Sequence, residues 1–146
     1  MSAPAVVDPD EALGRCVFSG REAKRGQRRG RVRFNVFLEK PRVQTLSVDR
    51  LDYAPLVEAV RLGERAAEKR RQPFYGWAVL RSGHAADRGR RVAATPRPDN
   101  PFHADVILPD TAVTDREEQK VHAQQLADSS SWRPRPDAAS PLLQRN

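Results

Sequence analysis

His103 and Asp105 are the two residues of this sequence whose types and spacing best fit a chemical reaction. They alternate with Phe102, Ala104 and Val106 in a short apolar run, which is typical of a β-strand. On a strand, residues two apart lie on one face, about 7 Å apart at Cα. A carboxylate beside a histidine orients the ring and raises its pKa, which suits general acid–base catalysis. The pair is therefore a candidate catalytic site for cleavage of RNA, a nucleotide or another phosphate-bearing substrate.

The same run also has a structural interpretation. Asn100-Pro101 favours a turn in which the asparagine side chain bonds the backbone two residues on. The following strand would then lie at the edge of a sheet, with His103 and Asp105 on its solvent-facing side. Polar residues there discourage pairing with another sheet. Because alternation alone places polar residues at these positions, the structural interpretation is favoured over catalysis.

Arginines are the second group that could do chemistry, because a guanidinium offers paired donors to a phosphate. The segment 20–30 holds five basic residues and glycines at 20, 26 and 30, so we expect a mobile hairpin loop there rather than a helix. This loop could bind phosphate, or it could be an ordinary solvated surface loop with no binding role. A strand is expected over residues 31–39, where apolar residues alternate. The candidate binding residues are Arg21, Arg25, Arg28, Arg29, Arg31, Arg33, Arg50 and Arg97.

The chain of 146 residues carries a formal net charge of +7 and has a sequence pI near 10.5. A basic surface attracts anionic partners, here nucleic acid or an acidic protein. Lysine occurs at only four positions, and such an excess of arginine is also what a GC-rich coding sequence produces without selection for binding. Charge therefore predicts an anionic partner without identifying it, and it gives no indication of oligomeric state.

Several other classes of protein are not indicated. The longest apolar run has four residues, whereas a membrane-spanning helix needs about 20. The N-terminal segment is acidic where a secretory signal would be basic and then apolar, so we expect a cytoplasmic protein with no membrane partner. Neither a phosphate-binding glycine loop nor a metal-ligand motif occurs, so no cofactor and no metal are predicted. Cys16 is expected to be a small buried hydrophobic residue rather than a nucleophile.

The order of the apolar runs predicts an α+β fold, with a small, mostly antiparallel sheet of about five or six strands and two helices packed on one face. Residues 74–81 are apolar on both faces and are expected to form a central buried strand. We expect residues 1–14 to be a flexible tail and 15–128 to form a single domain. Residues 129–146, with their proline, arginine and serine, are expected to be a disordered tail.

These observations favour a small basic protein that acts by binding an anionic partner. The first alternative is an enzyme that acts on RNA, a nucleotide or another phosphate-bearing substrate through His103 and Asp105. The second is an immunity-type or accessory protein that acts by binding another protein. The sequence alone does not decide among the three.

Overall fold

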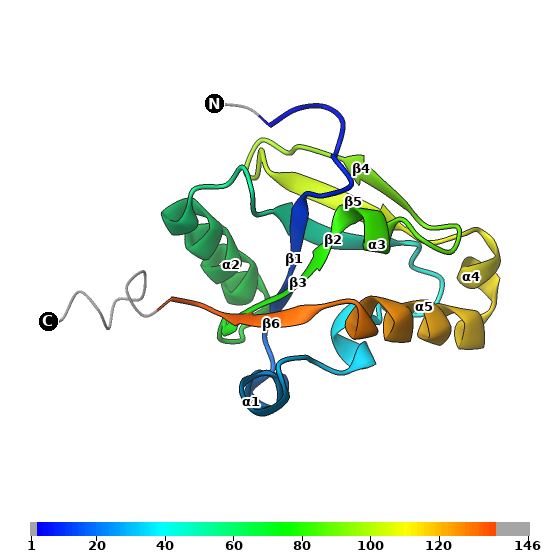
Figure 1. The fold of residues 1–146 in the computed structure, drawn as a ribbon. Coiled ribbons are helices and arrows are strands. Elements are labelled where there is room, and N and C mark those ends of the chain that lie inside the picture. The colour runs from blue at the N-terminus through cyan, green and yellow to red at the C-terminus, as the bar shows by residue number, and fades with distance from the viewer. Residues whose placement is uncertain (1–2, 137–146) are drawn as a thin grey trace, which may run out of the picture.

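Six β-strands form one antiparallel sheet in the computed structural model, which describes residues 3–136 (Figure 1). The strands are β1 (Ala12–Val17), β2 (Thr45–Arg50), β3 (Gly76–Arg81), β4 (Arg91–Ala94), β5 (His103–Ile107) and β6 (Ser131–Pro134). The helices are α1 (Gly20–Arg29), α2 (Leu56–Arg70), α3 (Ser82–Ala85), α4 (Thr111–Thr114) and α5 (Arg116–Asp128), with a 3₁₀ turn η1 (Phe34–Phe37). The predicted α+β class is therefore confirmed.

The sheet consists of two three-stranded halves joined by a short seam. Its strand order is β4-β5-β2-β1-β3-β6. β1 pairs with β3 along its whole length and β2 pairs with β5 over most of its own. In contrast, β1 and β2 pair only through Leu13 with Arg50 and Gly14 with Asp49. Beyond this seam the two strands separate, because each follows its neighbour on the other side.

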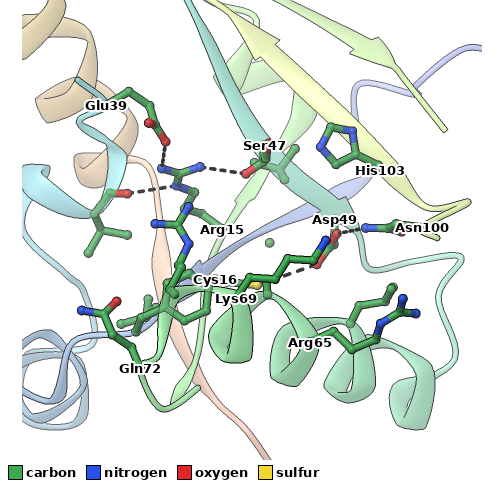
Figure 2. A pocket seen from close by; sticks show the side chains of 18 of the residues that line it. Arg15, Cys16, Glu39, Ser47, Asp49, Arg65, Lys69, Gln72, Asn100 and His103 are labelled. Atoms are coloured by element: carbon green, nitrogen blue, oxygen red, sulfur yellow. Dashed lines mark hydrogen bonds and ion pairs between the residues drawn. The ribbon is translucent and has the colours of Figure 1, made fainter. Parts of the chain in front are cut away.

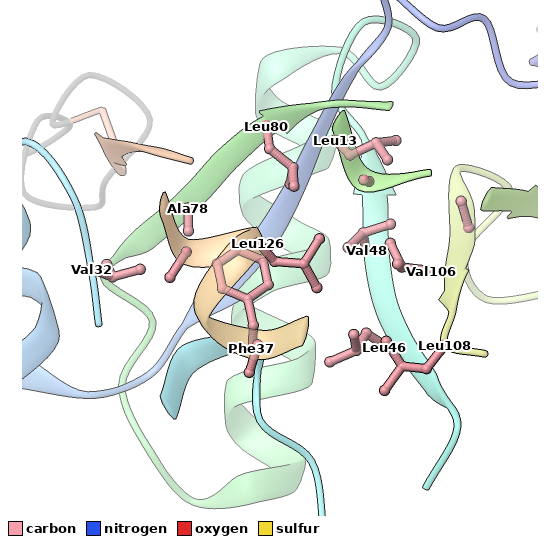
Figure 3. Close-up of a cluster of buried hydrophobic side chains, with 14 of the residues drawn as sticks. Leu13, Val32, Phe37, Leu46, Val48, Ala78, Leu80, Val106, Leu108 and Leu126 are labelled. Carbon is pink, nitrogen blue, oxygen red and sulfur yellow. The ribbon is translucent and has the colours of Figure 1, made fainter. Parts of the chain in front are cut away.

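Helices cover both faces of the sheet, so the prediction of two helices on one face was wrong. On one face, α5 and η1 pack over a core cluster that includes Leu13, Val48 and Leu126 (Figure 3). On the opposite face, α2 packs over a second cluster centred on Trp77. The adjacent β3 residues Trp77 and Ala78 belong to different clusters, so β3 is buried on both faces. Both surfaces of this strand are apolar, and each therefore requires its own cover.

The segment predicted to be a mobile loop is helix α1, because its glycines occupy positions that suit a helix. Ser19 is the N-cap, and its hydroxyl accepts a hydrogen bond of 3.2 Å from the backbone N–H three residues on. Gly30 is the C-cap, with a left-handed φ of 81°. Gly26 lies where Trp132 of β6 packs against the helix, and a Cβ at this position would be 2.5 Å from Cγ of Trp132. Glycine content alone therefore gave the wrong prediction.

The strand predicted over residues 31–39 is replaced by η1 and the extended segments on either side of it. Glu22 of α1 accepts hydrogen bonds from the backbone N–H and from Nε of Arg33, both at 2.9 Å. That backbone donor is therefore unavailable to a sheet. Val32 and Phe37 are buried in the cluster beneath α5. The apolar residues of this segment are thus buried without a strand partner.

Both ends of the expected domain extend further than the sequence suggested. β1 begins at Ala12, inside the expected N-terminal tail, and β6 forms at Ser131–Pro134, inside the expected C-terminal tail. β6 pairs with β3 from Val79 opposite Ser131 to Gly76 opposite Pro134. The remainder of the expected tail, 137–146, lies outside the described residues. No helix within residues 3–136 has both the length and the apolar composition needed to cross a membrane.

Candidate functional site

A groove opens where β1 and β2 separate, between α2 and the segment 35–40 (Figure 2). Its volume is about 700 Å³, which is within the usual range for small-molecule sites. We call this cavity the fork groove. Residues of β1, β2 and β5 form its floor, and α2 forms one wall through residues at helical spacing. These wall residues are Leu62, Arg65, Ala66, Lys69 and Arg70.

Arg15 bridges the gap between the separated strands. Its Nη1 donates to the carbonyl oxygen of Ser47 on β2 and its Nε to the carbonyl oxygen of Val36 in η1, both at 3.0 Å. Its Nη2 forms a 2.6 Å ion pair with Glu39. Arg15 thus supplies side-chain donors where a paired strand would supply backbone donors. The sequence analysis did not identify this residue as part of a site.

Asp49 is a buried acid on the floor of the fork groove. Its Oδ1 accepts a 2.8 Å hydrogen bond from Asn100, and its Oδ2 is 3.8 Å from Sγ of Cys16. Burial raises the pKa of Asp49, although the hydrogen bond from Asn100 and the nearby His103 act in the opposite direction. Burial and the adjacent Asp49 also raise the pKa of Cys16 well above its usual value. This shift favours the protonated thiol, and Cys16 is half-buried in the groove lining and not fully buried as expected.

His103 and Asp105 share one face of β5, as their alternation predicts. Nε2 of His103 lies 4.0 Å from Oδ1 of Asp105, which is too long for a hydrogen bond. On the other side of the ring, Nδ1 is 3.1 Å from the carbonyl oxygen and 2.8 Å from the hydroxyl oxygen of Thr95. Since a carbonyl oxygen only accepts, this contact assigns the proton to Nδ1. In the neutral ring with this tautomer, Nε2 is a buried acceptor, and it has no hydrogen-bond partner.

The alternative that placed this pair on a solvent-facing edge strand was wrong. β5 lies between β4 and β2, and His103 is only 4% exposed. The predicted Asn100 turn is present, because its Oδ1 accepts a 3.0 Å hydrogen bond from the backbone N–H of Phe102. The same side chain uses its amide nitrogen to bond Asp49, so the turn fixes part of the groove floor.

The candidate arginines at 50 and 97 have different environments. Arg97 is exposed and lines the fork groove together with His103. Arg50 is 2% exposed and forms a two-bond ion pair with Glu11, at 2.6 and 3.1 Å. It also donates to the carbonyl oxygen of Pro4. Arg50 therefore holds the N-terminal segment against the sheet instead of presenting a cation to a partner.

Four other candidate arginines meet in a second cavity of about 510 Å³ between α1 and α5. We call it the arginine recess. It is lined by Arg25, Arg29, Arg31 and Arg33, together with Val32, Phe34, Gln124 and Asp128. Nε of Arg25 is buried and has no hydrogen-bond partner. The remaining candidates, Arg21 and Arg28, are exposed on α1 outside this cavity.

Glu22, the one acidic residue between positions 20 and 33, is turned away from solvent. Burial alone would raise its pKa, but hydrogen bonds from the backbone and guanidinium of Arg33 lower it below the usual value. The carboxylate is thus ionised and neutralised internally. The exposed surface of α1 is left strongly basic.

Arg15 and Asp49 were missed by sequence reasoning, although each gave a signal. Arg15 lies between Leu13 and Val17 on an apolar strand face, and an arginine on such a face requires buried partners. Asp49 has the same side-chain direction on its strand as Ser47, which faces the groove. Neither signal identifies the partner, since Arg15 bonds residues 21 to 32 positions away.

Comparisons of the chain with protein-family models, with curated proteins and with solved structures gave no match. Within residues 3–136, His, Cys, Asp and Glu form no group of three or more that could hold a metal ion. The fork groove combines buried acceptors with cations, and the recess gathers arginines.

Proposed function

We propose that this protein binds an anionic partner, with nucleic acid the first candidate, through the arginine recess and the adjoining surface of α1. The observation that carries this proposal is the meeting of four arginines in one cavity, where Nε of Arg25 has no partner. A buried donor without an acceptor is costly, and a phosphate oxygen would satisfy it. A solvated charge run on a surface does not require such a convergence.

The charge distribution of α1 supports the same function. Arg21, Lys24 and Arg28 are exposed on the helix, while its acidic residue Glu22 is buried and paired. A continuous basic surface attracts a phosphate backbone over several nanometres at low salt and binds it by releasing counterions. Acid on this surface would weaken that attraction. One acid, Asp128, lines the recess and accepts a hydrogen bond from the neutral side chain of Gln124, so four arginines meet one carboxylate there.

Salt-dependent binding tests the proposal. Affinity for a fluorescent single-stranded RNA should fall as salt rises, with a slope of about 0.7 log unit per log salt for each neutralised phosphate. The variant Arg25→Gln/Arg29→Gln/Arg31→Gln should bind more weakly and reduce the slope by about 2. Arg33 is left in place because it pairs with Glu22.

The matched control is Arg81→Gln/Arg88→Gln/Arg91→Gln, which removes the same charge from exposed positions far from α1 in the sequence. This control should keep most of the affinity and most of the slope. A wild-type slope near zero would contradict nucleic-acid binding. Equal losses in the two triple variants would show a general charge effect and no site.

A second candidate function is an enzyme acting on a phosphate-bearing substrate, with His103 as the acid–base group. The observation that favours it is the unpaired Nε2 of His103 at the fork groove, 4.0 Å from the carboxylate of Asp105. If it is correct, His103→Ala should abolish hydrolysis of an RNA oligonucleotide even under conditions where its melting temperature shows that this buried variant is folded. If the variant is less stable but hydrolyses RNA as fast as the wild type, His103 has a structural role.

A further inference from the structure

The cations of the fork groove exceed the acids that could neutralise them. Three of its four acids are already in ion pairs, namely Glu39 with Arg15, Glu22 with Arg33 and Asp99 with Lys69. Within residues 3–136, the lining residues Lys40, Arg65, Arg70 and Arg97 have no acidic partner. All four are exposed and line the groove, and Arg70 also lies over the ring of Phe18, so we call them the cationic rim. An anion at the rim would meet cations from α2 and from the loop before β5.

The floor of the groove has the opposite character, since it offers hydrogen-bond acceptors. Nε2 of His103 is buried without a partner, and it is an acceptor in the neutral tautomer whose Nδ1 donates to the carbonyl oxygen of Thr95. Asp49 uses Oδ1 for Asn100, but its Oδ2 has only the weak thiol donor of Cys16, at 3.8 Å. Burial raises the pKa of Asp49, and the hydrogen bond from Asn100 opposes this shift. Both acceptors would gain from hydroxyl or amine donors on a ligand.

These two features describe a molecule with an anion at one end and hydrogen-bond donors at the other. We propose that the fork groove binds a phosphate ester that carries hydroxyl groups, of the sugar phosphate or nucleotide class. Its phosphate lies among Arg65, Arg70 and Arg97, and a hydroxyl donates to Nε2 of His103. The cavity of about 700 Å³ is large enough for either class.

This site is separate from the arginine recess and goes beyond the function proposed for α1. The two cavities share no lining residue, and all four recess arginines belong to the recess alone. The site coincides with the groove of the second candidate function, but it requires binding only. Turnover and binding are therefore distinguishable.

Calorimetric titration of the full chain tests the proposal with four probes: ribose 5-phosphate, adenosine 5′-monophosphate, inorganic phosphate and ribose. We expect saturable binding of at least one of the two esters, with inorganic phosphate bound about tenfold more weakly or not at all, and no binding of ribose. Binding of both esters assigns the site to sugar phosphates, and binding of the nucleotide alone assigns it to nucleotides. Both results support the proposal.

Variants locate the binding. Arg65→Gln/Arg70→Gln removes two exposed cations and should weaken the bound ester about tenfold or more. Arg61→Gln is the control for loss of a positive charge elsewhere on the same helix, because Arg61 is exposed and does not line the groove. His103→Ala should weaken the ester and leave any binding of inorganic phosphate unchanged. Because replacement of the buried His103 can impair folding, the melting temperature of His103→Ala is measured first. If this variant does not fold, the Arg65→Gln/Arg70→Gln variant alone tests the proposal.

Several outcomes would overturn the proposal. Neither ester binding at up to about 10 mM would remove the site. Equal weakening by Arg61→Gln and by the Arg65/Arg70 variant would also remove it. The triple variant of the arginine recess should leave ester binding unchanged, so the nucleic-acid function and this site can fail independently. Loss of ester binding in that triple variant would place the ligand at the recess and not at the fork groove.

Discussion

Arg15 donates a 3.0 Å hydrogen bond to the carbonyl oxygen of Ser47 across the gap where β1 and β2 separate. This contact joins the two halves of the sheet where their backbone pairing has ended. The two strands stay apart, and the carbonyl oxygen of Ser47 still has a hydrogen-bond donor although it faces no backbone N–H of β1. The fork groove exists because the Arg15 side chain bridges the gap, which backbone hydrogen bonds between β1 and β2 would otherwise close.

Replacing this bridge should destabilise the fold. Arg15→Ala removes donors from two carbonyl groups and leaves Glu39 unpaired, and we expect a loss of about 3 kcal/mol in the free energy of unfolding. Arg15→Lys keeps a charge near Glu39 but loses the planar fork of donors, so its loss should be intermediate. Denaturant unfolding measures all three proteins. The control Arg21→Ala is exposed and should stay within about 0.5 kcal/mol of wild type, and a similarly small effect of Arg15→Ala would contradict the bridge.

The buried acid Asp49 should make stability depend on pH. Its pKa is raised in the folded state, so the folded protein binds this proton more tightly than the unfolded chain does. The resulting stabilisation is fully present below the unfolded value of about 3.8 and is lost as pH rises through the higher folded value. Asp49→Asn keeps an acceptor for Asn100 and cannot ionise. The variant should therefore gain stability relative to wild type as pH rises from 4 to 7.

Chemical unfolding of both proteins across this pH range measures the effect. Only the difference between them is used, because other groups titrate equally in both. A difference that does not change with pH would contradict the raised pKa. Ester binding by the same variant reports whether the carboxylate itself serves the fork groove.

Gly26 should be required for the packing of β6 on α1. Alanine favours a helix by about 1 kcal/mol over glycine, but its Cβ would lie 2.5 Å from Cγ of Trp132. Overpacking of this kind costs about 1–3 kcal/mol, so Gly26→Ala should lower stability and shift tryptophan fluorescence. Gln27→Ala, on the exposed face of α1, is the control and should do neither. A more stable Gly26→Ala protein with unchanged fluorescence would contradict this packing.

Local patterns predicted the parts of the structure that local geometry controls. The alternation around His103 placed it with Asp105 on one face of a strand, because a strand turns every second side chain the same way. Asn100-Pro101 predicted the turn before that strand, since an asparagine oxygen reaches the N–H two residues on. The doubly apolar run of β3 likewise predicted burial on both faces.

Patterns failed where distant residues decided the outcome. Gly20, Gly26 and Gly30 suggested a loop, but they serve as the first residue, a contact point for Trp132 and the C-cap of α1. The alternation over residues 31–39 suggested a strand, but Glu22 captures the backbone donor of Arg33. In both cases the deciding contact comes from another element.

The sequence by itself determined the α+β class, the facing of His103 and Asp105 and the basic character of α1, because each depends on residues close in the chain. Only the tertiary structure decided that β1 and β2 separate, that Arg15 bridges them and that Asp49 meets Asn100 across 51 positions. It also divided the predicted arginines, burying Arg50 with Glu11 and gathering four others in one recess. The sequence gives the charge and type of each side chain, whereas its burial and its hydrogen-bond partners depend on how the strands pair.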